Sequence, residues 1–338
     1  MNKISFALIG CGQIAKRHAR HASTYGKLVA VCDIVKGRAL FLADQYGAAG
    51  YLQVDELLSS GNKIDVVVIC TPNGLHAEHA ISALNKGYHV LVEKPMSLTS
   101  DDCKKMIIAA EQAGKQLFTV VQNRFNPPVL AVKKALNENA FGEISSIQLT
   151  CFWNRSDAYY TNSWHGTKSM DGGILFTQFS HFIDLLYWFF GDIKKIISFT
   201  KNQDHTNSIE FEDCGVAALE FENGIIGTIN FSINSFAKNR EGSLTILGEN
   251  GTVKIGGEYL NTIEYAQFEK YQLENITDTA EANNYGTYQG SMSNHDKVYQ
   301  NIADTLQNNR PFYAHAYEGL KTVEIIERIY RAANEITL

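Results

Sequence analysis

A glycine-rich loop between an apolar strand and a helix is the feature that most restricts how this chain folds. The apolar run Ile4–Ile9 leads into Gly10-Cys11-Gly12-Gln13-Ile14-Ala15, and a helical pattern continues to Tyr25. In this context the glycines let the backbone approach a pyrophosphate, and the amide groups at the helix start stabilise its charge. The loop therefore predicts dinucleotide binding. The alternative is a tight turn that binds nothing.

Strand-like and helix-like segments alternate through the first third of the chain. We expect strands over residues 4–9, 28–32, 64–70, 88–92 and 116–121, and helices over 13–25, 35–46, 75–86 and 100–113, with a short helical turn at 55–60. Such alternation is typical of parallel βαβ units. It predicts an α/β N-terminal Rossmann domain over residues 1–122.

After Asn126-Pro127-Pro128 the pattern becomes mostly strand-like. We expect strands over 144–155, 193–200, 216–222, 225–233, 243–247 and 252–255, and helices over 129–139, 174–190, 296–308 and 319–334. Asn223-Gly224 is a strong hairpin signal. Residues 123–338 are therefore predicted to form an antiparallel-rich α+β domain. The polar stretch 275–293 is expected to be a long loop of the kind that shapes substrate sites.

Composition narrows the class of protein. The 338 residues are 45% hydrophobic and 20% charged, as in ordinary soluble globular proteins, and the net charge of −6 gives no basic field for nucleic acid or an anionic membrane. The six cysteines show no metal-ligand spacing, and no run is long enough for a membrane span. We expect a cytoplasmic protein with reduced thiols and no bound metal.

Two segments after predicted strands suit a cofactor. Asp33 lies 21 residues beyond Gly12, where a carboxylate accepts hydrogen bonds from ribose hydroxyls and repels a 2′-phosphate. This favours NAD over NADP, and a helix-capping role for Asp33 is compatible with it. Thr71-Pro72-Asn73 is expected to wall the cofactor, with a plain strand-ending turn as the alternative.

Lys94 and His181 are the candidate catalytic side chains. The apolar run Val90–Val92 stops at Glu93-Lys94-Pro95, which places the lysine where open α/β sheets bind ligands. Its ammonium group could polarise a substrate oxygen, or it could form a salt bridge with Glu93. A histidine, with an ordinary pKa of about 6.5, suits proton removal, but His181 could equally be a buried ring satisfied by Asp184.

A group of cations and aromatic rings lies near the predicted domain junction and the first long strand of the second domain. Such residues suit a phosphate together with a base or sugar ring, although a solvated rim is equally compatible with any one of them. The group comprises Arg124, Arg155, Tyr159, Tyr160, Trp164, His165 and Lys168.

Taken together, the segments GCGQIA, TPNGLH, EKP, QNRFNP and DGGILFTQFSHFIDLLYW resemble the glucose-fructose oxidoreductase/inositol dehydrogenase/MocA family over nearly the whole chain. The resemblance implies an NAD-dependent oxidoreductase whose second domain has a large, mostly antiparallel open sheet that carries substrate and oligomer contacts. It places Lys94 and His181 on the catalytic positions. The implied cofactor-binding residues are Gly10, Gly12, Gln13, Ile14, Asp33, Thr71, Asn73, His76, Glu93, Lys94, Gln122 and Trp164. The implied substrate-binding residues are Lys94, Arg124, Arg155, Tyr159, Tyr160, His165, Thr177, Gln178 and His181.

Within the family, CFWNRSDAYY, SWHGT and NREGSLTILGENGTVKIGG look most like the UDP-N-acetylglucosaminuronate 3-dehydrogenases of surface-polysaccharide synthesis. This implies oxidation of the C3 hydroxyl of a UDP-N-acetyl-hexuronic acid. Because antiparallel sheets often leave one face for a partner, we also expect a homodimer or homotetramer formed through the second domain. The chain departs from the family pattern in two places. Thr177 stands where many members have aspartate, and His165 stands where arginine is common, so the residues that hold an acidic substrate group are left open.

Two other functions compete with this interpretation. A free-sugar or inositol dehydrogenase would share the same machinery but would not need the nucleotide. A dinucleotide-binding sensor without catalysis would keep the fold, but relatives of that kind tend to lose the lysine, and here both Lys94 and His181 are present.

Overall fold

The computed structural model describes residues 3–274, 276, 282–284, 289–308 and 310–335. Contacts divide the chain into two compact units. The first comprises Met1–Val121 and His295–Val323, and the second comprises Gln122–Asn294 and Glu324–Leu338. The sequence placed all residues after 122 in one domain, whereas by contacts the segment 295–323 belongs with the first unit.

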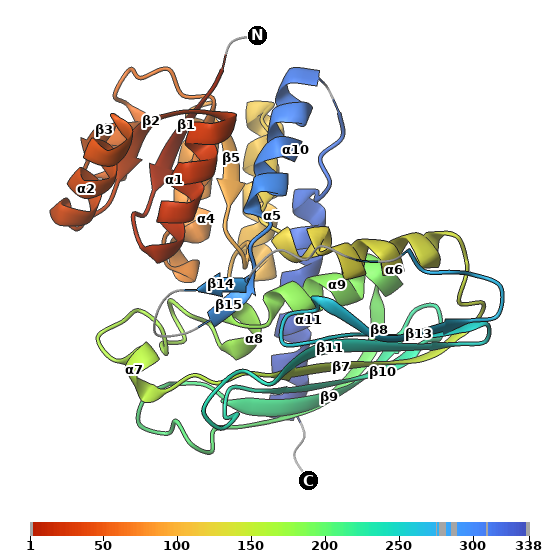
Figure 1. Cartoon of the computed structure of the whole chain (residues 1–338). Helices are drawn as coiled ribbons and strands as arrows, with labels where there is room; N and C mark the ends of the chain where they lie inside the picture. Colours follow the sequence, from red (N-terminus) through yellow and green to blue (C-terminus); the bar gives the residue numbers. More distant parts are fainter. Residues whose placement is uncertain (1–2, 275, 277–281, 285–288, 309, 336–338) are drawn as a thin grey trace. The chain divides into compact units, whose positions relative to one another are not determined.

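The first unit is built on a six-stranded, all-parallel sheet in the order β3-β2-β1-β4-β5-β6 (Figure 1). The strands are β1 (Ile4–Ile9), β2 (Gly26–Cys32), β3 (Ala49–Tyr51), β4 (Val66–Ile69), β5 (His89–Val92) and β6 (Leu117–Thr119). The strand order reverses between β1 and β4, and ligands of open α/β sheets bind beyond the carboxyl ends of the strands at such a point. The predicted Rossmann fold is confirmed.

Helices connect these strands. They are α1 (Gln13–Tyr25), α2 (Lys36–Tyr46), α3 (Val54–Leu58), the short 3-10 helix η1 (Asn73–Leu75), α4 (His76–Asn85) and α5 (Ser100–Ala113), and α10 (His295–Asn308) joins the unit from far along the sequence. The ring of Tyr299 on α10 packs against Phe6 and His18, with ring centroids 5.3 and 5.7 Å away. These contacts explain why α10 belongs with the first unit.

The second unit is built on a seven-stranded sheet in the order β13-β12-β11-β7-β10-β9-β8. The strands are β7 (Ile144–Phe152), β8 (Ile193–Lys201), β9 (Cys214–Phe221), β10 (Ile226–Ser232), β11 (Glu241–Gly248), β12 (Gly251–Gly256) and β13 (Thr262–Phe268). Neighbouring strands are antiparallel except for β7 and β10, which pair in parallel. The predicted hairpin at Asn223-Gly224 joins β9 to β10, and the mostly antiparallel sheet is confirmed.

Helices of the second unit cover one face of this sheet (Figure 1). They are the 3-10 helix η2 (Gln122–Phe125), α6 (Pro127–Asn137), α8 (Ile174–Thr177), α9 (Ser180–Phe190) and the end of α11 (Ala316–Glu335). The unit also contains α7 (Asp157–Tyr160). The Ser198 hydroxyl on β8 donates to the Ile329 carbonyl of α11, and the Trp153 ring lies 5.7 Å from Phe182 of α9. Successive side chains of a strand point to opposite faces of the sheet, so the neighbours of Ser198 on β8 lie on the face that these helices do not cover. There Ile197, Phe199, Val216 and Ile226 are exposed.

Two expectations for the second unit are wrong. A single helix over 174–190 was predicted, but α8 ends at Thr177 and α9 begins at Ser180. The Phe179 amide bonds the Ile174 carbonyl five residues back, which ends α8 although the apolar pattern continues through the break. The stretch 275–293 holds a short antiparallel pair, β14 (Ala282–Asn284) and β15 (Gln289–Met292), and its other parts lie partly outside the described residues.

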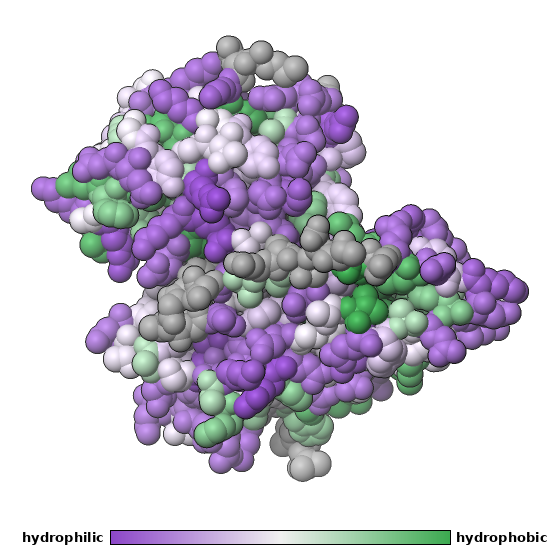
Figure 2. All heavy atoms as spheres, viewed as in Figure 1, coloured by the Kyte–Doolittle hydropathy of each residue, from purple (hydrophilic) through white to green (hydrophobic). Residues whose placement is uncertain are grey.

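No helix among the described residues combines the length and apolarity needed to span a bilayer. On the face shown in Figure 2, polar residues cover most of the surface and apolar residues form separate patches. All six cysteines are free thiols.

Candidate active site

The glycine-rich loop has the backbone shape that a pyrophosphate requires. Gly10 has φ +91°, and a Cβ atom there would lie 2.5 Å from the Cys70 carbonyl oxygen, so no larger residue fits. Gly12 immediately precedes α1, and a Cβ atom there would meet nothing within 4 Å. Open space beside Gly12 and the free amide groups at the start of α1, where Gln13 and Ile14 lie, therefore fit a dinucleotide phosphate.

Asp33 joins the loop to the end of β2. One carboxylate oxygen accepts a hydrogen bond from the Cys11 amide at 2.8 Å, and the other accepts from the Val35 amide at 2.7 Å. A carboxylate has about four acceptor positions, so both oxygens keep capacity for ribose hydroxyls. Asp33 thus fixes the loop and stays suited to the ribose role.

The turn after β4 contains three of the predicted cofactor residues. The Thr71 hydroxyl lies 3.1 Å from Nδ1 of His79, and Asn73 is buried in η1. Both ring nitrogens of His76 already face protein carbonyls, Nδ1 that of Pro95 at 2.8 Å and Nε2 that of Thr71 at 2.9 Å. The geometry thus gives His76 a role in holding the backbone, and its expected cofactor contact stays a prediction.

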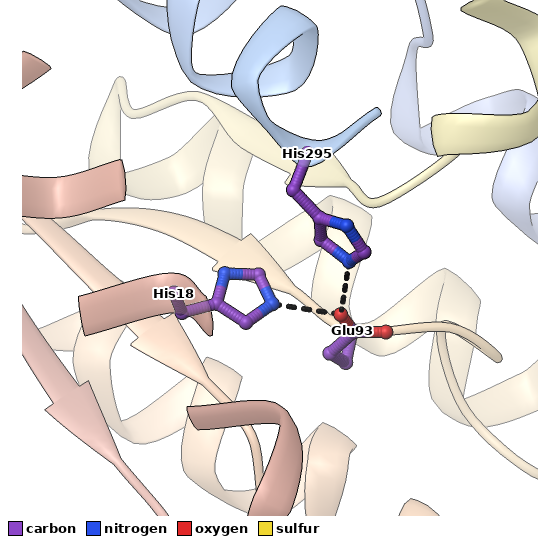
Figure 3. A group of neighbouring side chains, drawn as sticks. All are labelled: His18, Glu93 and His295. Atoms are coloured by element: carbon purple, nitrogen blue, oxygen red, sulfur yellow. Dashed lines mark hydrogen bonds and ion pairs between the residues drawn. The ribbon is translucent and has the colours of Figure 1, made fainter. Parts of the chain in front are cut away.

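Glu93 lies at the centre of a buried polar cluster (Figure 3). Nε2 of His18 donates to Oε1 of Glu93 at 2.7 Å, and Nε2 of His295 lies 3.5 Å from the same oxygen. The Tyr299 hydroxyl lies 2.9 Å from Nδ1 of His18 and can donate to it. Burial alone would raise the pKa of Glu93, but the hydrogen bond from His18 and the nearby ring of His295 hold it well below its usual range. Burial lowers the pKa of His295 to about 4.

His18, Glu93 and His295 also offer ligand atoms within 4.8 Å of one another, which invites comparison with a metal site. Nitrogen ligands of a tetrahedral zinc ion lie about 3.3 Å apart, given zinc–nitrogen bonds of about 2.0 Å. The 2.7 Å separation between His18 and Glu93 is shorter and is typical of a hydrogen bond. We therefore interpret the cluster as a hydrogen-bonded chain.

Lys94 follows Glu93 at the end of β5. Its backbone amide donates to Oε2 of Glu93 at 3.0 Å, so the same carboxylate that binds His18 also binds the lysine backbone. Both carboxylate oxygens of Glu93 thus contact protein, and its expected cofactor contact stays a prediction.

His181 is the second residue of α9 in the second unit and is buried. The amide nitrogen of Gln122 lies 3.0 Å from its Nε2 atom. An amide nitrogen only donates, so Nε2 accepts this bond and is unprotonated. The imidazole is therefore held in the form that can take up a proton.

Arg124, expected to bind substrate, is instead fully buried. Its Nε and Nη2 atoms donate to the two carboxylate oxygens of Asp184 at 2.8 and 2.6 Å, and its guanidinium group lies 5.0 Å from the centre of the Trp188 ring. Both carboxylate oxygens of Asp184 on α9 are thereby engaged. Arg124 thus anchors the helix that carries His181, and its assignment to the substrate is not tested by this pairing.

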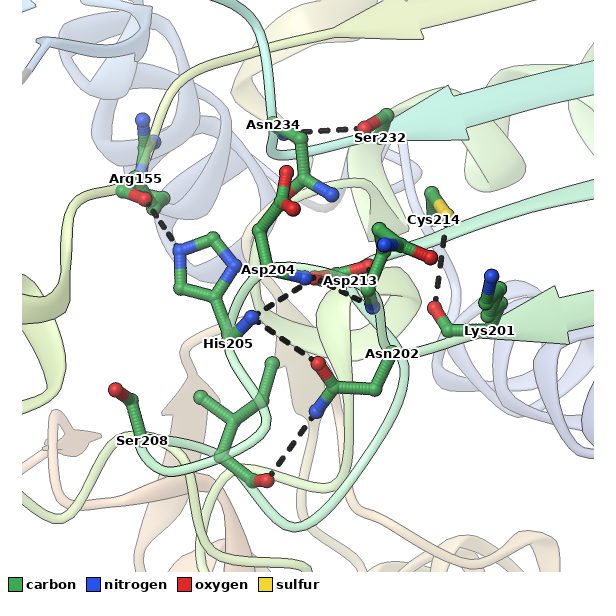
Figure 4. A network of polar contacts seen from close by, with 12 residues as sticks. Arg155, Lys201, Asn202, Asp204, His205, Ser208, Asp213, Cys214, Ser232 and Asn234 are labelled. Atoms are coloured by element: carbon green, nitrogen blue, oxygen red, sulfur yellow. Dashed lines mark hydrogen bonds and ion pairs between the residues drawn. The ribbon is translucent and has the colours of Figure 1, made fainter.

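Arg155 is buried and bound by the protein at several points. It donates to the carbonyls of Asn154 at 2.6 Å and Gln289 at 3.3 Å, and to the Asn239 side chain at 3.3 Å. Its own carbonyl accepts a hydrogen bond of 2.8 Å from Nε2 of His205 (Figure 4). His205 in turn is held by Asp213, at 3.2 Å from Nδ1. Arg155 is thus a fixed cation.

Aromatic rings gather near Arg155, as the sequence suggested. The His165 ring stacks on Trp164 with centroids 3.9 Å apart, and the Tyr159 ring lies 4.4 Å from His165. The Tyr159 ring also lies 5.4 Å from the Arg155 guanidinium group. Stacked rings next to a cation are suited to bind a base or a sugar ring.

Several buried polar groups of the second unit have no hydrogen-bond partner among the described residues. Gln178 lies three residues before His181, and neither its amide nitrogen nor its amide oxygen is paired. Buried polar groups are almost always paired, so these atoms have capacity to bond water or a ligand. Others of this kind are the Tyr160 hydroxyl, the Gln122 side-chain oxygen and the Ser180 hydroxyl. No pattern in the sequence singled out Ser180.

Thr177, which stands where many relatives have aspartate, bonds within the protein. Its hydroxyl donates to a carboxylate oxygen of Asp171, a fully buried residue. Asp171 also accepts a hydrogen bond of 2.7 Å from the Gly166 amide. A carboxylate is therefore present beside position 177 although it comes from another residue.

Glu212 was not identified from the sequence, yet it supports the loop before α8. Its Oε1 atom accepts hydrogen bonds from the Tyr330 hydroxyl at 2.6 Å and from the Ile174 amide at 3.2 Å. A Cβ atom at Gly173, which has φ +135°, would lie 2.3 Å from the Tyr330 oxygen. Gly173 thus leaves room for the tyrosine. No local pattern could reveal a contact between residues so far apart.

Glu212 predicts a pH dependence of stability. Burial raises its pKa from 4.5 to about 8, so between these values the folded chain binds a proton that the unfolded chain has released. The free energy of unfolding should therefore fall as the pH rises through this window. A pKa difference of one corresponds to about 1.4 kcal/mol, so the loss should amount to several kcal/mol.

Glu212→Gln keeps the Oε1 acceptor and removes the titration. Urea unfolding from pH 5 to pH 9 should show a flatter profile for this variant and a higher stability than the wild type at the alkaline end. Parallel profiles for the two proteins would show that Glu212 is not the titrating group.

The chain belongs to the GFO/IDH/MocA oxidoreductase family. The family's NAD-binding Rossmann fold matches residues 4–121, and its C-terminal alpha/beta domain matches residues 133–337. With the glycine loop and Asp33 described above, this makes the protein an NAD-dependent oxidoreductase.

Solved structures extend the similarity to the whole chain. The WlbA dehydrogenase from Bordetella pertussis, in complex with NADH and UDP-GlcNAcA, is 34% identical, with a TM-score of 0.89 over 99% of this chain and 98% of that one. The WlbA dehydrogenase from Chromobacterium violaceum, with the same ligands, is 32% identical, with a TM-score of 0.89 over 99% and 95% of the two chains. The D-glucoside 3-dehydrogenase of Escherichia coli is 30% identical over 67% of this chain and 66% of that protein.

Proposed function

We propose that this protein is an NAD-dependent sugar dehydrogenase that oxidises the C3 hydroxyl of a UDP-linked N-acetyl-hexuronic acid. The observation that carries the proposal is the full-length similarity to two dehydrogenases that bind NADH and UDP-GlcNAcA. The residues support it, because the chain has a lysine at the end of β5 and a neutral histidine on α9.

In this proposal the substrate hydroxyl replaces the Gln122 amide at Nε2 of His181, which has a single lone pair, and gives its proton to that atom. Lys94 donates a hydrogen bond to the same oxygen and stabilises the negative charge that develops on it. Bound NAD accepts the hydride from the carbon atom. Gln178 pairs its free amide atoms with polar groups of the sugar.

Arg155 and the rings of Tyr159, Trp164 and His165 are assigned to the nucleotide or to an acidic group of the substrate. A fixed guanidinium group next to stacked rings suits a phosphate joined to a base. Arg124 is not assigned to the substrate because its guanidinium group forms a buried ion pair with Asp184.

A free-sugar or inositol dehydrogenase is the second candidate, since the glucoside dehydrogenase is nearly as similar in sequence. Thermal unfolding in the presence of NAD separates the two. We expect UDP-GlcNAcA to raise the melting temperature more than UDP-GlcNAc, free N-acetylglucosamine or inositol. A ligand at about 100 times its Kd adds about 2.7 kcal/mol of stability. Stabilisation by a free sugar or inositol alone would favour the second candidate, and stabilisation by NAD alone would favour a sensor.

We also propose a homodimer or homotetramer formed through the second unit. Ile197, Phe199, Val216 and Ile226 expose an apolar strip on the uncovered face of its sheet. Light scattering on the wild type should give a dimer or tetramer, and Phe199→Glu should give a smaller species. A wild-type monomer at working concentration would contradict the proposal.

A further inference from the structure

We propose that Glu93 and His76 are positioning residues that hold the backbone on either side of Lys94 and thereby fix where its ammonium group can reach. The inference rests on the proposed function, in which Lys94 contacts the substrate. Glu93 accepts a hydrogen bond from the amide of Lys94, and His76 bonds the carbonyl of Pro95. The two side chains come from different elements and act on adjacent residues.

Glu93 is itself held from two directions. His18 on α1 donates to its Oε1 atom at 2.7 Å, and His295 at the start of α10 lies 3.5 Å from that atom. His18 and His295 are fully buried and Glu93 nearly so, so water does not compete for these bonds. Three elements far apart in the sequence thereby meet on one carboxylate, whose second oxygen binds the lysine backbone.

His295 adds an argument for the charge on this carboxylate. Neither of its ring nitrogens makes a hydrogen bond to the residues that the structure describes, yet Nε2 faces Oε1 of Glu93 (Figure 3). Burying the unpaired His295 ring costs stability. An ionised Glu93 carboxylate that attracts the edge of this ring explains why the ring lies beside it. The cluster thus keeps Glu93 ionised and able to accept the Lys94 amide.

His76 fixes the other side of Lys94. Its ring bridges the Pro95 carbonyl after β5 and the Thr71 carbonyl after β4. A neutral imidazole donates through one of its nitrogens and a protonated one through both. In either form the ring ties the lysine segment to the neighbouring strand end.

The lysine side chain explains why such anchoring matters. Its four-carbon stem is flexible, so the place of the ammonium group depends on the place of the backbone. A displacement of about 1 Å at a reacting centre can cost about 100-fold in rate. Loss of either anchor should therefore slow the chemical step and leave NAD binding nearly unchanged.

The test compares Glu93→Ala, Glu93→Gln and His76→Gln with two matched controls. Asp65→Asn removes a carboxylate that binds the Ser5 amide at 2.7 Å, and His89→Gln removes a histidine that binds the Gln116 amide at 2.9 Å. Both controls lie at the opposite end of the same sheet. Circular dichroism melts and NAD titration calorimetry are run on every variant.

With NAD and UDP-GlcNAcA, we expect kcat to fall about 100-fold in Glu93→Ala. A smaller fall is expected in Glu93→Gln, which keeps an acceptor for the Lys94 amide, and in His76→Gln. The isotope effect on kcat for substrate deuterated at the reacting carbon should rise as kcat falls, because the chemical step becomes slower. Wild-type kcat in Glu93→Ala and His76→Gln, or losses matched by weaker NAD binding and equal in the two controls, would overturn the inference.

A second readout does not require turnover. The rate at which acetic anhydride modifies Lys94, followed by mass spectrometry in the protein without cofactor, should change in Glu93→Ala and His76→Gln and stay at the wild-type value in both controls. An unchanged rate in the anchor variants would refute the positioning role. If the wild type fails to oxidise UDP-GlcNAcA, the proposed function fails, and this labelling still decides the inference.

Discussion

Lys94→Met is expected to lower kcat about 100- to 1,000-fold, which is the usual cost of losing one donor to a developing oxyanion. Methionine keeps the length and apolar stem of lysine but cannot stabilise negative charge on the reacting oxygen. Steady-state formation of NADH from NAD and UDP-GlcNAcA measures the loss. Because the ammonium group acts mainly in the transition state, KM for the substrate should change much less than kcat.

Lys86→Met is the matched control for this prediction. Lys86 lies in the same unit, and its ammonium group binds the Ser59 hydroxyl at the protein surface. The control should keep wild-type kcat. If Lys94→Met also kept it, Lys94 would have no part in the chemistry, and the dehydrogenase mechanism proposed above would be wrong.

His181→Asn is expected to lower kcat by about 100- to 10,000-fold, the range typical of a lost general base. Asparagine is polar and can still bond Gln122, but it cannot take up a proton near neutral pH. Hydroxide can replace a missing base, so the residual activity of the variant should rise steadily toward alkaline pH. Rapid-mixing measurements of the first turnover report the chemical step itself.

His205→Asn serves as the matched control for stability because His205 is a second buried histidine of the same unit. Comparing the melting temperatures of the two variants separates a lost base from a damaged fold. A His181→Asn protein that melts like the wild type and turns over at the wild-type rate would remove His181 from the mechanism.

Much of the first unit could be predicted because local signals determine it. Each buried strand of a parallel sheet is a continuous apolar run, and glycines mark the helix ends. The predicted strand over 4–9 and helix over 13–25 agree with β1 and α1 residue for residue. The short edge strand β3 was missed, because three residues are too few to show a period.

The second unit was harder to predict because its details depend on distant contacts. The parallel pairing of β7 and β10 joins strands about 80 residues apart and has no local signature. The edge strand β13 is largely exposed, and Ala266 interrupts the alternation of apolar and polar residues that marks the inner strands. The break between α8 and α9 likewise interrupts an unbroken apolar pattern.

The candidate site likewise contains residues that local sequence signals identify and residues that depend on distant contacts. Residue type and place in a strand were enough to single out Gly10, Gly12, Asp33 and Lys94. The pairing of Arg124 with Asp184 was not foreseen, because a cation close to polar and aromatic residues has the same pattern in a substrate site and in a buried ion pair. The supports of the site were also missed, since Glu212 and His295 act on residues more than 30 positions away.

The central claim is that Lys94 and His181 act on one and the same substrate hydroxyl. A double-mutant cycle on first-turnover NADH formation tests it most directly, with Lys94→Met, His181→Asn and the double variant assayed with NAD and UDP-GlcNAcA. Residues that work as a unit show strongly non-additive losses, so the double variant should be little slower than the slower single variant. If the fold-decrease in rate of the double variant equalled the product of the decreases in the two single variants, the two side chains would act independently. That result would contradict the account.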